Sequence, residues 1–223
     1  MPGPSAAFAS AADLDLAATS VFVDFDGTIS TEDVGVHLLE RLGAAGWREI
    51  DAEYDAGEIG SRVCLLDEWE LLPRDPELLR SVAAEVPLDP GTEPLVAALR
   101  AAGAEVSVVS DGFGFYATER LAHLGVPVVT NAVDWSTGRL EFPYEDRCCA
   151  CSSCGTCKQA PIKDARHRGR ATVLVGDGTS DRKAALLADV VFAKGALARW
   201  CALNDAPYIP FETLTDVRVA LGL

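Results

Sequence analysis

Asp24 and Asp26 are the residues of this chain whose types and spacing most clearly suggest chemistry. They end a short apolar run in the segment 21–28, which reads VFVDFDGT. An apolar run that breaks into an acidic, glycine-containing segment is typical of a buried strand that leads into an active-site loop. Residues i and i+2 of an extended segment share a face, so both carboxylates would reach one substrate. Asp-Gly is also a common hairpin turn, and for this motif alone both interpretations stay open.

Two further apolar runs end in polar residues. One ends in the Ser-Asp-Gly of residues 110–112, and the other ends at Asp177, with Asp181 four residues later. Lys158 lies between these two runs. The carboxyl ends of parallel strands meet at one edge of an open α/β sheet, where active sites form. We therefore expect these side chains to lie close together.

The elements that would position these residues can be predicted from hydrophobic spacing. The first region has helical spacing throughout, in segments 34–42, 47–54, 61–72 and 76–86. After it, strands and helices alternate. The strands are expected at 106–110, 126–130 and 190–192, and the helices at 91–102, 113–124, 161–168 and 181–187. A short hairpin is expected around 136–138. Strands separated by helices predict an α/β core with a central parallel sheet and right-handed crossovers.

Composition limits the classes of function. The chain has 223 residues and a formal charge of -15, which argues against nucleic acid as a partner. No apolar stretch approaches the ~20 residues of a membrane span, and the opening residues lack the basic region of a secretory signal. We expect a cytoplasmic protein, a monomer or homodimer, that does not bind membranes. Residues 1–18 are expected to form a flexible tail.

The order of the motifs is more specific than any one of them. Two aspartates, a serine, a lysine and two more aspartates, in that order, resemble the haloacid dehalogenase-like phosphatases. Within that family the chain is most similar to the branch that includes phosphoserine phosphatases and methionine-salvage phosphatases. The stretch Cys-Gly-Thr-Cys-Lys at 154–158 and the segment 189–194 are similar to the methionine-salvage phosphatases. The resemblance implies a Rossmann-like three-layer core formed by residues 19–30 and 87–223. It also implies a small all-helical cap at 31–86, inserted after the first strand.

The resemblance also implies roles for the motif residues. Asp24 would attack phosphorus to give an aspartyl-phosphate, and Asp26 would act as general acid and base. Ser110 and Lys158 would hold the phosphate oxygens. Mg²⁺ would be bound by Asp24, Asp26, Asp177 and Asp181, although Asp181 is alternatively a helix cap. The substrate-binding residues implied are Thr28, Asp33, Asp111, Gly112 and Ser180.

The expected activity is hydrolysis of a small phosphorylated metabolite. The dehalogenases of the superfamily lack the second aspartate, so Asp26 favours phosphatase chemistry. A methionine-salvage phosphate ester and phosphoserine are the substrate candidates. Asp33 falls where phosphoserine phosphatases carry a glutamate that meets the substrate ammonium. Leu66 falls where they carry an arginine for the substrate carboxylate, and the nearby Arg62 is out of register.

Five cysteines crowd into ten residues: Cys148, Cys149, Cys151, Cys154 and Cys157. Cys148, Cys151, Cys154 and Cys157 have regular CxxC spacing, which could form a structural Zn²⁺ site or, with less support, an iron–sulfur site. A redox-sensitive disulfide and reduced thiols are the other interpretations, and all stay open. A rival hypothesis for the whole chain is a non-catalytic metal-responsive or scaffold protein that works through this loop.

Overall fold

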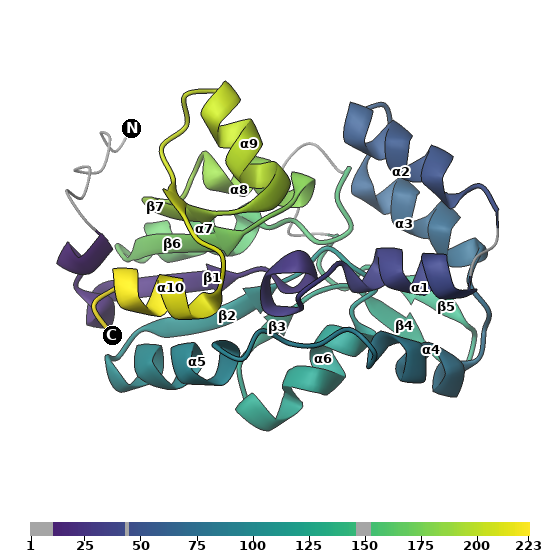
Figure 1. Cartoon of the computed structure of the whole chain (residues 1–223), viewed down its shortest axis with the longest axis horizontal. Helices are drawn as coiled ribbons and strands as arrows, with labels where there is room; N and C mark the ends of the chain where they lie inside the picture. Colours follow the sequence, from purple (N-terminus) through teal and green to yellow (C-terminus); the bar gives the residue numbers. More distant parts are fainter. Residues whose placement is uncertain (1–10, 43–44, 146–152) are drawn as a thin grey trace.

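A six-stranded parallel sheet forms the centre of the molecule (Figure 1). The computed structural model describes residues 11–42, 45–145 and 153–223. The strand order is β3-β2-β1-β6-β7-β8. The strands are β1 (Thr19–Val23), β2 (Glu105–Val109), β3 (Val128–Val129), β6 (Ala171–Gly176), β7 (Val190–Ala193) and β8 (Ile209–Pro210). The predicted α/β class with a central parallel sheet is confirmed.

Strand β1 lies between β2 and β6 because its residues are apolar or small enough to be covered on both faces. All five of its residues are buried. Val21 is in register with Val106 of β2 and with Val173 of β6. Val21 packs into one core layer and Phe22 into the other, as the alternation of side chains along a strand requires. This central position places the residue after β1 in the middle of the sheet edge.

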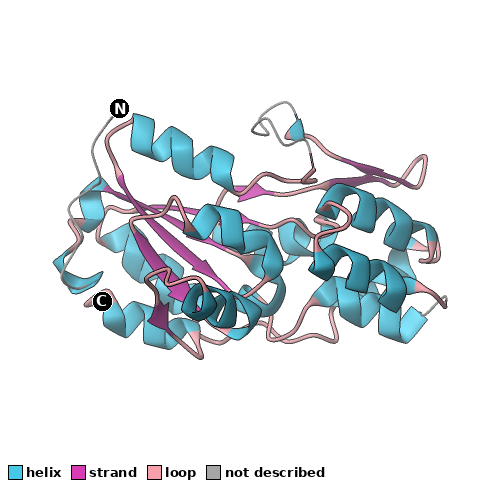
Figure 2. Ribbon diagram, turned by 90° about the horizontal axis from the view of Figure 1, so that it is seen from above, coloured by secondary structure: helices cyan, strands magenta, loops and turns pink. Residues whose placement is uncertain are grey.

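Helices cover both faces of the sheet (Figure 2). One layer contains α5 (Thr92–Ala101), α6 (Phe115–Leu121) and α10 (Leu214–Ala220). The other contains α7 (Gln159–His167), α8 (Arg182–Ala185) and α9 (Gly195–Leu203). The result is the three-layer arrangement expected when helical crossovers join parallel strands.

Four helices lie together beyond the carboxyl ends of the strands, on the right of Figure 1. They are α1 (Val34–Leu42), α2 (Trp47–Ala56), α3 (Ser61–Glu70) and α4 (Pro76–Ala83), and we call them the helical unit. The hairpin of β4 (Ala132–Asp134) and β5 (Arg139–Glu141) packs against this unit. The indole N–H of Trp69 donates to the Gly138 carbonyl at 2.9 Å, and the Trp69 and Trp135 rings lie 6.3 Å apart. The predicted hairpin is therefore present, and it packs against the helical unit.

Part of the predicted tail is packed. Residues 11–18 were expected to be flexible, but they form two short 3₁₀ helices, Ala11–Asp13 and Leu16–Ala18. Ala11 and Leu14 are buried in the core because their apolar side chains meet the sheet layer, while residues 1–10 lie outside the described ranges. Within the described residues, no helix has the length and apolar character needed to cross a membrane.

Candidate active site

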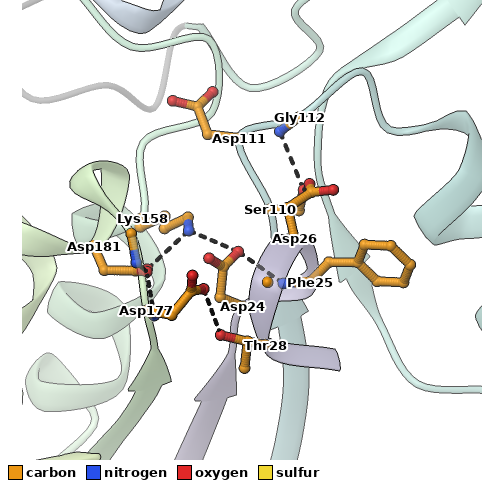
Figure 3. Close-up of polar contacts among 12 residues, drawn as sticks. Asp24, Phe25, Asp26, Thr28, Ser110, Asp111, Gly112, Lys158, Asp177 and Asp181 are labelled. Atoms are coloured by element: carbon orange, nitrogen blue, oxygen red, sulfur yellow. Dashed lines mark hydrogen bonds and ion pairs between the residues drawn. The ribbon is translucent and has the colours of Figure 1, made fainter. Parts of the chain in front are cut away.

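The residues predicted to do chemistry meet at the carboxyl edge of the sheet (Figure 3). Asp24 follows β1, Ser110 follows β2, and Asp177 follows β6, and these three strands are neighbours. The Asp24 N–H donates to the Val175 carbonyl at 2.9 Å, so Asp24 is still held by the sheet. The adjacency of the strands therefore brings together residues that are up to 153 positions apart in the chain.

Lys158 is the cation buried among these carboxylates. Its Nζ lies 2.7 Å from Asp24 Oδ1 and donates to Asp181 Oδ1 at 2.8 Å (Figure 3). The Lys158 side chain is 2% exposed and that of Asp181 is 0% exposed. Burial opposes the charge, but Asp181 and Asp24 together raise the pKa of Lys158 above its usual value. The ammonium therefore stays charged at the centre of the site.

Asp24, Asp177 and Asp181 form a group suited to a cation. Each offers one carboxylate oxygen, and these oxygens lie within 4.8 Å of one another. Burial and the neighbouring Asp181 raise the pKa of Asp24, and the same two causes raise that of Asp177 to about 6. A bound divalent cation would relieve this repulsion, and carboxylate oxygens are the ligands that Mg²⁺ prefers. The donors present therefore fit a hard divalent cation.

Local contacts hold these carboxylates in position. Thr28 Oγ1 donates to Asp177 Oδ1 at 2.8 Å, so Thr28 contacts a carboxylate of the group suited to a cation. Asp181 Oδ2 accepts the N–H groups of Asp177 and Gly178, each at 3.2 Å. With Lys158 on its other oxygen, Asp181 is well placed as a supporting carboxylate. Gly27 has a φ of +71°, and a Cβ there would strike the Asp177 carboxylate.

Asp26 faces away from this group, toward the helical unit. Its Oδ1 accepts the Val34 N–H at 3.1 Å, and its Oδ2 accepts the hydroxyls of Ser110 and Tyr116, both at 3.2 Å. Burial, and after it the negative charge of Asp33, raise the pKa of Asp26 to about 8. The carboxyl can therefore carry a proton near neutral pH. The contact of Tyr116 with Asp26 was not predicted from the sequence. The Ser110 hydroxyl also accepts the Gly112 N–H at 3.1 Å.

The Asp111 side chain bonds residues from other segments of the chain. Its carboxylate accepts the Thr156 N–H at 2.6 Å and the Asn131 amide at 3.3 Å, and it also bonds the Ser61 hydroxyl. Ser61 begins α3, and Thr156 lies just before Lys158. The Asp111 side chain therefore joins the helical unit to the loop that carries Lys158.

A cavity of about 280 Å³ lies between the sheet edge and the helical unit. Asp24, Asp26, Asp177 and Ser180 line it from the core, and Asp33 lines it next to α1. Among its described lining residues there is no lysine, arginine or histidine. Sequence reasoning missed several other lining residues, among them Asp51, Tyr54, Ser61, Cys64 and Glu68. Their spacings of three, four and seven within α2 and α3 are the signal that could have indicated them.

Three of the five clustered cysteines lie outside the described residues. Cys148 and Cys151 lie outside the described residues, as does Cys149. Cys157 is buried and Cys154 is half-buried. Within the described ranges, the residues grouped closely enough for a metal ion are Asp24, Asp177 and Asp181, with no cysteine among them. The zinc, disulfide and thiol interpretations stay predictions.

Comparisons with known proteins define the class. The family model of the haloacid dehalogenase-like hydrolases matches residues 21–186, which is most of the chain. The protein therefore belongs to the haloacid dehalogenase-like hydrolase family. Its relatives are named phosphatases, and it is an enzyme of the phosphoric monoester hydrolase class.

Two related proteins and two solved structures illustrate this assignment. The 2-hydroxy-3-keto-5-methylthiopentenyl-1-phosphate phosphatase of Exiguobacterium sp. is 29% identical over 89% of this chain and 95% of its own length. The protein of the same name from Brevibacillus brevis is 26% identical over 88% of this chain and 92% of its own length. A phospho-aspartyl intermediate analogue of phosphoserine phosphatase has a TM-score of 0.67 at 21% identity, covering 88% of this chain and 95% of its own. The phosphoserine phosphatase of T. onnurineus has a TM-score of 0.68 at 19% identity, covering 95% and 98%. At these identities the solved structures show the fold alone.

Proposed function

We propose that this protein is a Mg²⁺-dependent phosphomonoesterase that forms an aspartyl-phosphate on Asp24. The observation that carries the proposal is the position of the Asp24 carboxylate, with the Lys158 ammonium 2.7 Å away and the Asp177 and Asp181 carboxylates within 4.8 Å. Phosphoryl transfer needs an in-line nucleophile and positive charge around the transferred group. Lys158 supplies one positive charge, and a divalent ion held by Asp24, Asp177 and the Asp26 carbonyl would supply the other.

The chain's own groups account for the movement of electrons and protons. An Asp24 oxygen forms a bond to phosphorus as the bond from phosphorus to the leaving oxygen breaks. Asp26, whose pKa of about 8 lets it hold a proton, donates that proton to the leaving alkoxide. Asp26 then takes a proton from the water that hydrolyses the aspartyl-phosphate. A Mg²⁺ ion held by the Asp24 and Asp177 carboxylates would neutralise charge on the phosphoryl oxygens.

The remaining phosphate contacts come from the end of β2 and the start of α7. Ser110 and the N–H groups of Asp111 and Gly112 would hold phosphate oxygens, opposite the metal carboxylates. Asp181 fixes Lys158 through the 2.8 Å bond and acts as a positioning residue. The cavity encloses the substrate under the helical unit, which would exclude water during the transfer.

Substrate candidates can be ranked. The names of the curated relatives support a methionine-salvage phosphate ester. Phosphoserine is less well supported, because the described residues that line the cavity include no cation for its carboxylate. Arg62 is paired with Glu145 at 2.6 Å and does not line the cavity. The cytoplasmic location and the oligomeric state stay predictions.

Hydrolysis of p-nitrophenyl phosphate tests the proposal. We expect turnover that requires Mg²⁺, is abolished by EDTA and falls at least about 10³-fold in Asp24→Asn. Asp164→Asn is the matched control, because Asp164 is exposed on α7 and outside the site. A panel with the methionine-salvage ester and phosphoserine would then rank substrates. Equal rates for Asp24→Asn and Asp164→Asn would contradict the assignment of the nucleophile.

A further inference from the structure

The Tyr116 hydroxyl contacts the carboxyl group that would protonate the leaving group. It donates to Asp26 Oδ2 at 3.2 Å, and Tyr116 also lines the active-site cavity. The Ser110 hydroxyl donates to the same oxygen at 3.2 Å, while the Val34 N–H donates to Asp26 Oδ1 at 3.1 Å. Two hydroxyl groups therefore converge on one oxygen of Asp26.

Two glycines allow Tyr116 to approach Asp26. Gly114 lies directly before α6 and has a φ of +85°, a conformation that glycine adopts readily. Gly112 leaves the space in which the two groups meet, because a Cβ at this position would strike both the Tyr116 hydroxyl and the Asp26 carboxylate. The segment between β2 and α6 is therefore built to bring the tyrosine hydroxyl to the sheet edge.

The Tyr116 ring is fixed by aromatic neighbours. It is 2% exposed and packs against the rings of Phe25 and Phe115, with centroid distances of 5.6 and 5.0 Å. A tyrosine hydroxyl lies at the end of a rigid ring, so its position is set once the ring is packed. The contacts that bury the ring therefore also direct its hydroxyl at Asp26.

Ser110 cannot serve both Asp26 and the phosphate. Its hydroxyl has one hydrogen to donate, and the proposed phosphatase uses that hydrogen for a phosphate oxygen. With substrate bound, the bond from Ser110 to Asp26 Oδ2 is given up and the bond from Tyr116 to the same oxygen stays. When Asp26 loses its proton it becomes a carboxylate, and hydrogen bonds to charged acceptors are roughly twice as strong as neutral ones. The Tyr116 bond therefore strengthens as the proton moves to the leaving oxygen, and such an interaction stabilises the transition state more than the bound substrate.

We propose that Tyr116 is a positioning residue that holds Asp26 for protonation of the leaving group. This role rests on the proposed phosphatase function and adds a residue to it. In the transfer step the bond from phosphorus to the leaving oxygen breaks, and the proton of Asp26 passes to that oxygen as the Asp26 O–H bond breaks. The Tyr116 hydroxyl keeps its own hydrogen and donates it to the carboxylate that results. Removal of the hydroxyl should therefore slow each substrate according to its need for a proton.

Phosphate esters whose leaving groups differ in basicity test this role. p-Nitrophenolate is a weak base that leaves without a proton, whereas phenolate is a stronger base and the alkoxide of benzyl alcohol is the strongest of the three. For Tyr116→Phe with Mg²⁺ we expect kcat/KM for benzyl phosphate to fall about 10- to 100-fold, the range of one hydrogen bond to a charged group. The value for p-nitrophenyl phosphate should stay within about threefold of the wild type, and phenyl phosphate should lie between the two. The comparison uses kcat/KM because this quantity does not include the later hydrolysis of the aspartyl-phosphate.

Tyr208→Phe is the matched control, because it removes a tyrosine hydroxyl outside the cavity, in the other core layer. It should leave kcat/KM unchanged for all three esters. Asp26→Asn should slow benzyl phosphate far more than p-nitrophenyl phosphate. Asp26→Asn/Tyr116→Phe should be no slower than Asp26→Asn alone, since no acid is left to hold. An equal loss for the three esters in Tyr116→Phe is the result of a merely structural role, and that result, or no loss at all, would overturn the inference.

The same three esters separate this inference from the proposed function. Absence of p-nitrophenyl phosphate hydrolysis in the wild type would reject the phosphatase itself. Hydrolysis in the wild type that falls as steeply with leaving-group basicity as in Asp26→Asn would overturn the role of Tyr116 alone, because Asp26 would then supply no proton. A wild type that is less sensitive to leaving-group basicity than Asp26→Asn, with Tyr116→Phe between them, is the expected result.

Discussion

Asp181→Asn is the substitution that most directly tests how Lys158 is held. Asp181 is fully buried, with Lys158 Nζ at 2.8 Å on one oxygen and two backbone N–H groups at 3.2 Å on the other. An amide in its place must turn its NH₂ toward one of these donors. Breaking a buried pair costs about 3–5 kcal/mol, but Lys158 keeps Asp24, so we expect about 2–3 kcal/mol. For a chain of this length that lowers the Tm by roughly 5–10 °C.

Thermal unfolding followed by circular dichroism in EDTA measures this loss without a contribution from bound metal. Asp164→Asn, which removes an exposed carboxylate, should change the Tm by less than about 2 °C. Lys158→Met alone leaves Asp24 and Asp181 facing each other, so Lys158→Met/Asp181→Asn should lose less stability than the sum of the two single variants. An Asp181→Asn protein with an unchanged Tm, or strict additivity in the double variant, would refute the ion-pair reasoning.

The remaining predictions concern the turn at Gly27, the buried carboxyl of Glu68 and the hydrogen bond between Ser61 and Asp111. Gly27→Ala should lower kcat/KM for p-nitrophenyl phosphate by at least about 10²-fold, because the new Cβ strikes the Asp177 carboxylate. Gly125→Ala is the control, since Gly125 also has a positive φ, of +60°, but has open space around it. Its kcat/KM should stay within about threefold of the wild type. The pKa of Glu68 rises from an ordinary value of 4.5 to about 8 in the folded protein, so between these pH values the folded protein holds a proton that the unfolded chain has released. The free energy of unfolding should therefore fall as pH rises, by at most about 1.4 kcal/mol per pH unit from this group. Urea unfolding at several pH values should show a smaller decrease in the free energy of unfolding with pH for Glu68→Gln than for the wild type. Asp67→Asn, a control at an exposed carboxylate on the same helix, should show the wild-type decrease. Ser61→Ala should speed hydrogen exchange in α3, and unchanged exchange there would mean that the hydroxyl does not hold the helix.

The parts of the fold predictable from sequence are those set by local hydrophobic spacing. The helix expected at 34–42 is α1, Val34–Leu42, and the strand expected at 190–192 is β7, Val190–Ala193. Both have clear periodicity and a distinct start. Asp24 and Asp177 could also be placed, because a carboxylate directly after a buried parallel strand has only the sheet edge to occupy.

The parts that could not be predicted depend on contacts between distant segments. Ala11 and Leu14 belong to a short alanine-rich segment without strong periodicity, and only the neighbouring core makes it ordered. The two-residue β8 is too short for alternation to be visible. Glu68 resembles an ordinary surface glutamate in the sequence, and its burial follows from the way α2 and α3 pack over the sheet edge.

Asp111 shows why the site depends on a residue whose role was not visible in the motif. From the sequence it is one of the substrate-binding residues that the resemblance implies, and in the structure its side chain bonds Ser61 at the start of α3. The Gly155 N–H donates to the same Ser61 hydroxyl at 3.3 Å, and the loop then continues for three residues to Lys158. The Ser61 hydroxyl therefore bonds both Asp111 and the loop that carries Lys158. If α3 separates from the core, either the contact between Ser61 and Asp111 breaks or the loop moves with α3. The position of the helical unit over the cavity is therefore coupled to the position of the Lys158 ammonium.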